Sequence, residues 1–130
     1  MKTKVIKYTP YFEWVSQQSG VQYRVGITNY AQQMLGEIVY LELPSVGESI
    51  KQDQPCAFVE SRKSVVDILA PISGVIVAEN RQLLLNPQLI NDSPYDEGWL
   101  FTVEAEDLQQ WNALLESEPH IDDSKGIQND

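Results

Sequence analysis

Residues 56–70 contain two apolar stretches that flank a short polar one. Residues 56–59 and 65–70 are mostly apolar, whereas residues 60–64 (Glu, Ser, Arg, Lys, Ser) are too polar to bury. Two β-type runs separated by a short polar stretch predict a hairpin whose turn faces water, spanning residues 59–68. Lys63 lies in that turn. We therefore expect two strands to hold its amine in the solvent.

A lysine in an exposed turn has two interpretations. It can be a charge that keeps the edge of a sheet soluble, which is the commoner case. It can also be an amine presented for acylation, because an amide on the ε-nitrogen removes the charge and turns the side chain into a tether. The hairpin alone does not distinguish these interpretations, so the rest of the chain has to decide.

Length and charge narrow the class of protein. The chain has 130 residues and a formal charge of −10, from 19 acidic and nine basic side chains. This length favours one domain with a modest core. Nucleic-acid binding requires clustered Lys and Arg, so the charge argues against it. An acidic surface instead favours salt-dependent docking to basic partner surfaces.

Reactive residue types are scarce. Cys56 is the only cysteine and His120 the only histidine, so we expect no disulfide framework, no metal site and no Ser–His or Cys–His catalysis. Cys56 is expected to be a buried small apolar residue. No apolar run approaches membrane-spanning length and no signal-peptide core is visible, so we expect a protein of the bacterial cytoplasm, with a mature organellar chain as the alternative. We also expect a monomer.

The hydrophobic pattern predicts a mostly β chain with short helices. Thr28 is a good N-cap and Gly36 a good stop for a helix over 28–36, whose expected core face is Ile27, Tyr30, Ala31, Met34 and Leu35. Helical turns are expected at 81–86 and 87–91, the second with Pro87 in its first position. Strands are predicted at 4–8, 13–16, 21–26, 37–43, 49–51, 75–79 and 99–103, with a turn at 17–20.

The end of the chain changes character twice. Residues 107–115 predict an amphipathic helix whose inward side chains are Leu108, Trp111, Leu114 and Leu115. From residue 117 the chain is acidic and without periodicity, which indicates a disordered tail. We therefore expect one domain over 1–116 and a tail over 117–130.

A short internal repeat brackets Lys63. Residues 44–50 and 71–76 each contain a proline, a glycine and a following β-type run. Two similar β units on either side of a hairpin suggest a small flattened barrel with approximate two-fold symmetry.

Several blocks of the chain form a pattern that is more specific than any one of them. The blocks are residues 13–15, 25–32, 35–44, 46–48, 59–64, 67–68, 70–74, 91–95 and 98–100. In this order they resemble the H protein family of the glycine cleavage system. The resemblance covers most of the chain, from about residue 8 to about residue 115, whereas a lone Glu-Ser-x-Lys would be weak evidence.

This resemblance implies a barrel-sandwich hybrid of the lipoyl/biotinyl-carrier type, with short flanking helices and a C-terminal helix. It implies that Lys63 carries covalent lipoate and that the protein is a non-catalytic carrier. The arm would take an aminomethyl group from glycine decarboxylase to the aminomethyltransferase and be reoxidised by dihydrolipoamide dehydrogenase. A lipoate ligase or octanoyltransferase would attach the cofactor.

Four residues are candidates to contact the arm or the modifying enzyme: Glu60, Ser61, Asp67 and Glu13. For Glu60 and Asp67 the alternative is a solvated hairpin charge. Glu13 could line a surface groove for the loaded arm or be an ordinary solvent-facing strand residue. Trp14, Trp99 and Trp111 are expected to be packing anchors.

The chain departs from the family pattern close to Lys63. Arg62 stands where the family usually has a small, apolar or uncharged residue, and residues 64–66 (Ser, Val, Val) replace a stretch that is usually smaller. Phe12 replaces the histidine that usually precedes Glu-Trp. We still expect Lys63 to be modifiable. Two alternatives remain: an H-like paralogue in lipoate relay or a redox route, and an unmodified interaction module. A biotin carrier is disfavoured because no methionine flanks Lys63.

Overall fold

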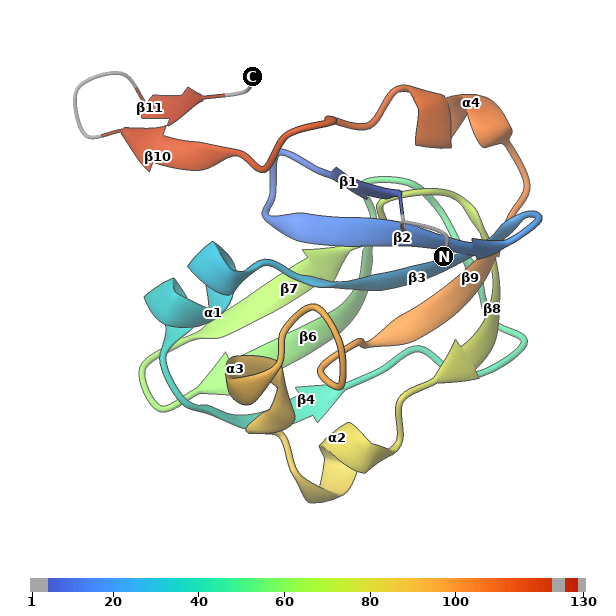
Figure 1. Ribbon diagram of the computed structural model, residues 1–130. Coiled ribbons are helices and arrows are strands. Elements are labelled where there is room, and N and C mark those ends of the chain that lie inside the picture. The colour runs from blue at the N-terminus through green and yellow to red at the C-terminus, as the bar shows by residue number, and fades with distance from the viewer. Residues whose placement is uncertain (1–4, 123–125, 129–130) are drawn as a thin grey trace.

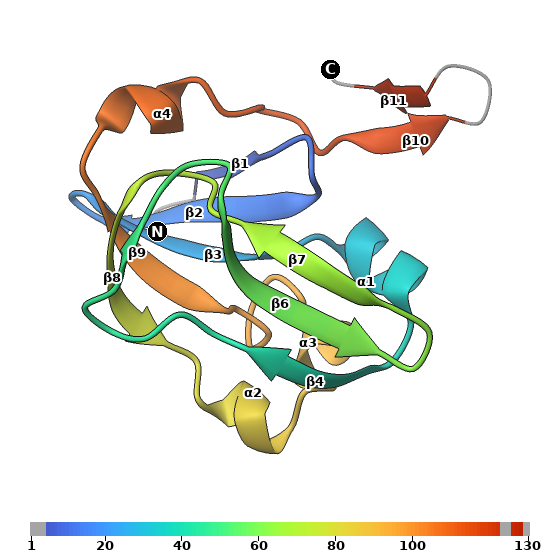
Figure 2. The same ribbon diagram turned by 180° about the vertical axis from the view of Figure 1, so that it is seen from behind.

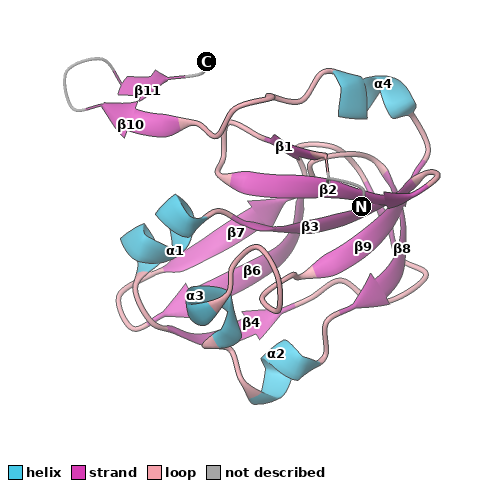
Figure 3. Cartoon of the chain, viewed as in Figure 1, coloured by secondary structure: helices cyan, strands magenta, loops and turns pink. Residues whose placement is uncertain are grey.

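The computed structural model describes residues 5–122 and 126–128, which form a mostly β fold with short helices (Figures 1 and 3). The helices are α1 (Asn29–Leu35), α2 (Gln82–Leu85), α3 (Leu89–Asp92) and α4 (Leu108–Asn112). The strands are β1 (Ile6–Tyr8), β2 (Glu13–Ser19), β3 (Gln22–Ile27), β4 (Ile38–Glu42), β5 (Ser49–Ile50), β6 (Pro55–Ser61), β7 (Val65–Leu69), β8 (Gly74–Glu79), β9 (Phe101–Ala105), β10 (His120–Asp122) and β11 (Gly126–Gln128).

Two antiparallel sheets make the body of the protein. The larger has the strand order β1-β2-β3-β9-β8-β5 and the smaller the order β4-β6-β7, and the smaller sheet lies in front in Figure 2. Neither sheet closes on itself. This arrangement confirms the predicted barrel-sandwich architecture with short helices.

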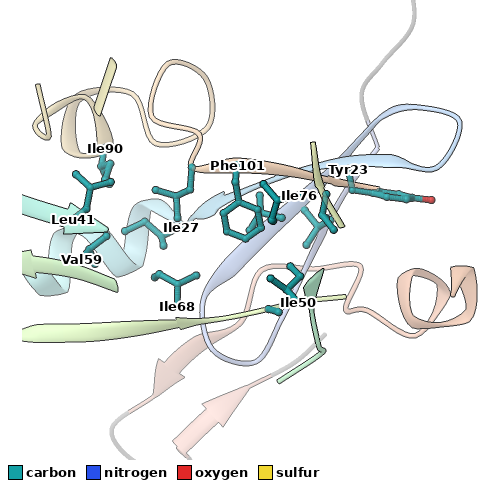
Figure 4. Packing of buried hydrophobic residues seen from close by; sticks show 14 of the residues in the cluster. Tyr23, Ile27, Leu41, Ile50, Val59, Ile68, Ile76, Ile90 and Phe101 are labelled. Atoms are coloured by element: carbon teal, nitrogen blue, oxygen red, sulfur yellow. The ribbon is translucent and has the colours of Figure 1, made fainter. Parts of the chain in front are cut away.

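The core lies between the sheets and takes side chains from both. Ile27 and Phe101 come from the larger sheet, whereas Leu41, Val59 and Ile68 come from the smaller one, and all five are at most 2% exposed (Figure 4). Along β6, the buried residues Val59 and Ser61 alternate with the less buried Phe58 and Glu60, as the period-2 pattern requires. Burial of such side chains stabilises each strand by roughly 1.5–3 kcal/mol per large residue. The strands of the β6–β7 hairpin are therefore held in place by their packing in the core.

The internal repeat brings its two halves into contact. In β5, Ser49 pairs with Val75 of β8 and Ile50 pairs with Gly74. The turn before β5 is tied to the same strand, since the N–H of Gly47 donates to the carbonyl of Ile76 at 2.8 Å. The two segments that bracket Lys63 in the sequence thus hydrogen-bond to each other.

Helix α1 confirms its predicted ends but not its whole predicted face. The hydroxyl of Thr28 accepts the N–H of Ala31 at 3.1 Å, and Gly36 has a φ of 80°. Leu35 is buried and Ala31 packs against the core, whereas Met34 is 56% exposed. The prediction of Met34 as core is wrong, because a two-turn helix contacts the core along one narrow line and the residue before Leu35 points about 100° away from it.

Helix α4 is shorter than predicted. It begins after its N-cap Asp107 and ends at Asn112. Trp111 is buried, whereas Leu108 is 47% exposed. The inward orientation predicted for Leu108 is therefore wrong. Leu115 lies beyond the helix and instead forms a β-bridge with Tyr8, with 2.8 Å hydrogen bonds in both directions. Backbone pairing with β1 thus replaces the expected last turn.

Smaller differences concern element ends. Strand β2 runs on to Ser19, so part of the predicted 17–20 turn is strand, and the reversal centres on Gly20 with a φ of 56°. The second helical turn begins at Leu89, so Pro87 precedes the helix rather than starting it.

Part of the predicted tail has regular structure. Strands β10 and β11 pair antiparallel, with Ile121 opposite Ile127, while residues 123–125 and 129–130 of the tail lie outside the described residues. A domain boundary at residue 116 stays a prediction. Within the described ranges, none of the helices has the length and apolar character needed to cross a membrane.

Candidate functional site

The turn between β6 and β7 holds Lys63 as predicted. The N–H of Ser61 donates to the carbonyl of Ser64 at 2.8 Å, which leaves Arg62 and Lys63 as the two central residues. Both are exposed. We call these two residues the hairpin tip. Below it, Glu60 pairs with Val65 and Val59 with Val66, so a regular ladder begins directly under the lysine.

The side chain of Ser61 organises this turn from inside. Its hydroxyl accepts the N–H groups of Lys63 at 3.3 Å and Ser64 at 3.2 Å, and it is only 4% exposed. A serine hydroxyl that accepts backbone N–H groups further along the chain stabilises a turn locally. The expectation that residues 60–64 are all too polar to bury is therefore wrong for Ser61, because its hydroxyl is satisfied by backbone N–H groups beneath the tip, where it orders the backbone of Lys63.

The stem of Lys63 lies over the glycine that ends α1. A Cβ atom added to Gly36 would be 3.9 Å from Cε of the lysine. Among the described residues, the Lys63 ammonium takes part in no ion pair. Acylation would therefore break no salt bridge in that part of the chain.

Among the described residues, Arg62 forms an ion pair, whereas Lys63 does not. Its Nε donates to Glu37 Oε1 at 2.7 Å, and the second carboxylate oxygen of Glu37 accepts from the side-chain amide of Gln88. Hydrogen bonding to Arg62 lowers the pKa of Glu37 from its usual range. Arg62 thus meets the carboxylate of the residue directly before β4.

The remaining candidates on the hairpin point outward from the smaller sheet. Glu60 is flanked by Tyr40 of β4 and Val65 of β7 in one row, while the next outward row is Glu42, Phe58 and Asp67. The Tyr40 and Phe58 rings have centroids 5.9 Å apart. The pKa of Tyr40 is raised, first by the charge of Glu42 and less by that of Glu60. We call these six residues the outer face.

The outer face combines an aromatic centre with three carboxylates. Tyr40 is 49% and Val65 60% exposed, and both lie within two strand positions of the tip. Sequence reasoning did not identify Tyr40 or Phe58 as candidates, because strand pairing across β4, β6 and β7 was needed to bring them together. The alternation of inward and outward residues along each strand was the only feature of the sequence that could place these side chains on one face of the sheet.

Glu13 lies away from the tip, at the start of β2. Its side chain is only 2% exposed and accepts hydrogen bonds from the Thr9 hydroxyl and, at 3.3 Å, from the N–H of Leu69. Burial raises the pKa of Glu13 to about 7. The alternative of a solvent-facing strand residue is therefore wrong. Contact with a loaded arm stays a prediction, and it would need the arm extended along β7.

Among the described residues, the other reactive side chains form no second reactive site. Burial raises the pKa of the Cys56 thiol to about 12, so the thiol is protonated and unreactive at neutral pH. The part of the chain that the structure describes contains no group of three or more His, Cys, Asp or Glu side chains arranged to hold a metal ion. Trp14 and Trp111 are buried packing residues, as predicted.

Comparisons with known proteins agree with one another. The model of the family described as "Glycine cleavage H-protein" matches residues 6–125. The chain is 45% identical over 113 residues to a glycine cleavage system H protein from Photorhabdus laumondii, covering 87% of each sequence. It is 46% identical over 112 residues to the one from Sodalis glossinidius, covering 86% of each.

A solved structure is similar as well. The crystal structure of a glycine cleavage system H protein from Mycobacterium marinum superposes with a TM-score of 0.74 at 38% sequence identity. The match covers 78% of this chain and 84% of that one.

Proposed function

Since the chain belongs to the glycine cleavage H-protein family, we propose that Lys63 carries a lipoyl group by which the protein transports an aminomethyl unit between enzymes. The protein is a carrier component of the glycine cleavage system. The observation that carries the proposal is an exposed lysine at the tip of a hairpin whose strands are anchored in the core.

The residues at the tip fit an acylated lysine. The amine is exposed and free of ion pairs among the described residues, and its stem lies over Gly36, where no side chain competes for the space. An attached arm would extend roughly 10 Å or more beyond the backbone, given ordinary bond lengths along about ten bonds.

The bound group would supply the thiol and redox chemistry, and the protein would supply position. Ser61 orders the backbone of Lys63, and the β6–β7 ladder holds the turn against the core. A rigid base confines the ordering cost of binding to the arm itself. The protein's own residues thus define where the arm begins and in which direction it leaves the surface.

We further propose that the outer face, next to the tip, docks the partner enzymes. Glycine decarboxylase, the aminomethyltransferase and dihydrolipoamide dehydrogenase must each bring an active site within reach of the same arm. Aromatic side chains surrounded by carboxylates favour partner surfaces with apolar and basic groups. Glu42, Glu60 and Asp67 supply the charge, and Tyr40 and Phe58 supply the contact area.

The experiment is a glycine–bicarbonate exchange assay with purified glycine decarboxylase and lipoylated protein. We expect exchange with the wild type and none with Lys63→Arg, while Lys51→Arg, an exposed lysine on the larger sheet's side, behaves as the wild type. Modified protein that supports no exchange would favour a paralogue in lipoate relay. An unmodified lysine together with an unchanged cellular phenotype of Lys63→Arg would favour an interaction module.

A further inference from the structure

The turn that carries Lys63 lacks the geometry that two-residue hairpins prefer. Such turns usually have positive φ at one or both central residues, because that matches the twist of the strands. Neither Arg62 nor Lys63 has a positive φ, and the residue types there are not the glycine or asparagine that would favour it. The conformation of the tip therefore depends on side-chain contacts, of which the bonds to the Ser61 hydroxyl within the turn are the first.

A second contact is made to the neighbouring strand of the same sheet, because Ile38, next to Glu37, pairs with Ser61, next to Arg62. Arg62 reaches Glu37 at 2.7 Å, and Gln88 holds the other oxygen of the same carboxylate. We call these three side chains the tip clasp. They join the turn, the start of β4 and the segment before α3.

Hydrogen bonds hold the backbone around Glu37 in place. Asn91 accepts the N–H of Ile38 at 2.9 Å and donates to the carbonyl of Gly36 at 2.8 Å, so its side chain binds the backbone on both sides of Glu37. Gly36 is also the residue over which the Lys63 stem lies. A carboxylate on this segment thus holds Arg62 at a defined place relative to the lysine.

We propose that the tip clasp positions Lys63 for acyl attachment, by holding the Arg62–Lys63 turn in one orientation against the α1–β4 junction. Arg62 is then a positioning residue, and Glu37 offsets the positive charge that it adds beside the amine. This inference rests on the proposed acylation of Lys63.

The test is a double-mutant cycle on the rate of octanoyl or lipoyl attachment by a purified transferase or ligase. Arg62→Ala and Glu37→Ala each remove the same ion pair, so each is expected to lower kcat/KM by about twofold to fivefold, the range of an exposed pair. The double variant should fall no further than either single one. The charge-swapped variant, Arg62→Glu with Glu37→Arg, should recover part of the loss.

A second readout does not need acylation. The ¹H–¹⁵N heteronuclear NOE of the Lys63 and Ser64 amides is expected to fall in both single variants, with the thermal unfolding midpoint nearly unchanged. Glu106→Ala serves as the control, because it breaks a similarly exposed pair with Lys51 at 3.1 Å on the larger sheet. Both readouts should be unchanged in this control.

The alternatives give different results. Two outcomes would show that Arg62 contacts the modifying enzyme directly, and both would overturn the clasp. In the first, the losses of the two single variants add up in the double variant. In the second, Arg62→Ala lowers the rate and Glu37→Ala does not. Unchanged rates and unchanged NOE values in all variants would also overturn the clasp. If the wild type accepts no acyl group, the proposed function fails, and the NOE measurement alone decides whether the clasp orders the tip.

Discussion

The side-chain hydroxyl of Ser61 accepts the backbone N–H of Lys63 at 3.3 Å, from a position that is almost fully buried. The lysine that faces the solvent is thus ordered by the residue two positions before it. Because Ser64 donates to the same oxygen at 3.2 Å, one hydroxyl fixes both N–H groups on the far side of the turn.

Removal of this hydroxyl should loosen the tip. Ser61→Ala is expected to lower the free energy of unfolding by about 1 kcal/mol, the typical value of a hydrogen bond whose partners regain water only in part. Amide hydrogen exchange at Lys63 and Ser64 should accelerate, and acyl attachment should slow. Ser64→Ala, which removes an exposed hydroxyl from the same turn, is the control. Equal exchange rates in the two variants would contradict this role of Ser61.

Glu13 should make stability depend on pH. Its folded pKa of about 7 exceeds the unfolded value of about 4.5, so the folded state binds more protons between these values and loses stability as pH rises through this window. The penalty is absent below about pH 4.5 and complete above about pH 7, with an upper bound of about 3 kcal/mol. Glu13→Gln should remove it.

Urea unfolding at pH 5 and pH 8 measures the effect. The stability of Glu13→Gln relative to the wild type should increase with pH. A difference that stays constant across this range would show that the buried carboxyl is ionised in the folded protein as readily as in the unfolded chain.

Gly74 should tolerate no side chain. A Cβ there would lie 2.0 Å from the carbonyl oxygen of Glu104 in the adjacent strand, and a paired backbone cannot move aside. Gly74→Ala should therefore destabilise the fold by about 3 kcal/mol or more. Val75→Ala, at a half-exposed position next to it, should cost less than about 1 kcal/mol. Similar midpoints of thermal unfolding for the two variants would refute the close approach.

The outer face should contribute to docking. Tyr40→Ser removes an exposed aromatic ring, so the KM of glycine decarboxylase for the lipoylated protein should rise by about fivefold, as for a moderate interface residue, with kcat nearly unchanged. Val75→Ser, which alters a similarly exposed residue of the larger sheet, should leave both constants as they are. A KM that changes equally in the two variants would place docking elsewhere.

The hairpin and its neighbours could be predicted from the sequence because local patterns determine them. Alternation defines β3, an N-cap and a glycine define α1, and two apolar runs around a polar stretch define β6 and β7. Each of these signals lies within a few residues of the element that it predicts. Met34 and Leu108 were assigned inward because periodicity gives a face but not its width, and short helices bury only a narrow line.

The environment of the site could not be predicted in the same way. Glu37 binds Arg62, 25 positions away, and Glu13 accepts the N–H of Leu69, 56 positions away. Neither pair has a local signature. Glu37 and Arg62 meet through the pairing of β4 with β6 within one sheet, whereas Glu13 and Leu69 meet where the two sheets pack together. The exposed position of Lys63 on a hairpin turn was therefore predictable from the sequence, whereas the residues that hold this turn in place were not.

Peptide mass spectrometry of protein produced together with a lipoylation system tests the central claim most directly. The account predicts a lipoyl or octanoyl adduct on the peptide that contains Lys63, and no adduct in the Lys63→Arg variant. An unmodified Lys63 under conditions that modify a known carrier, or an adduct on another lysine such as Lys51, would contradict it.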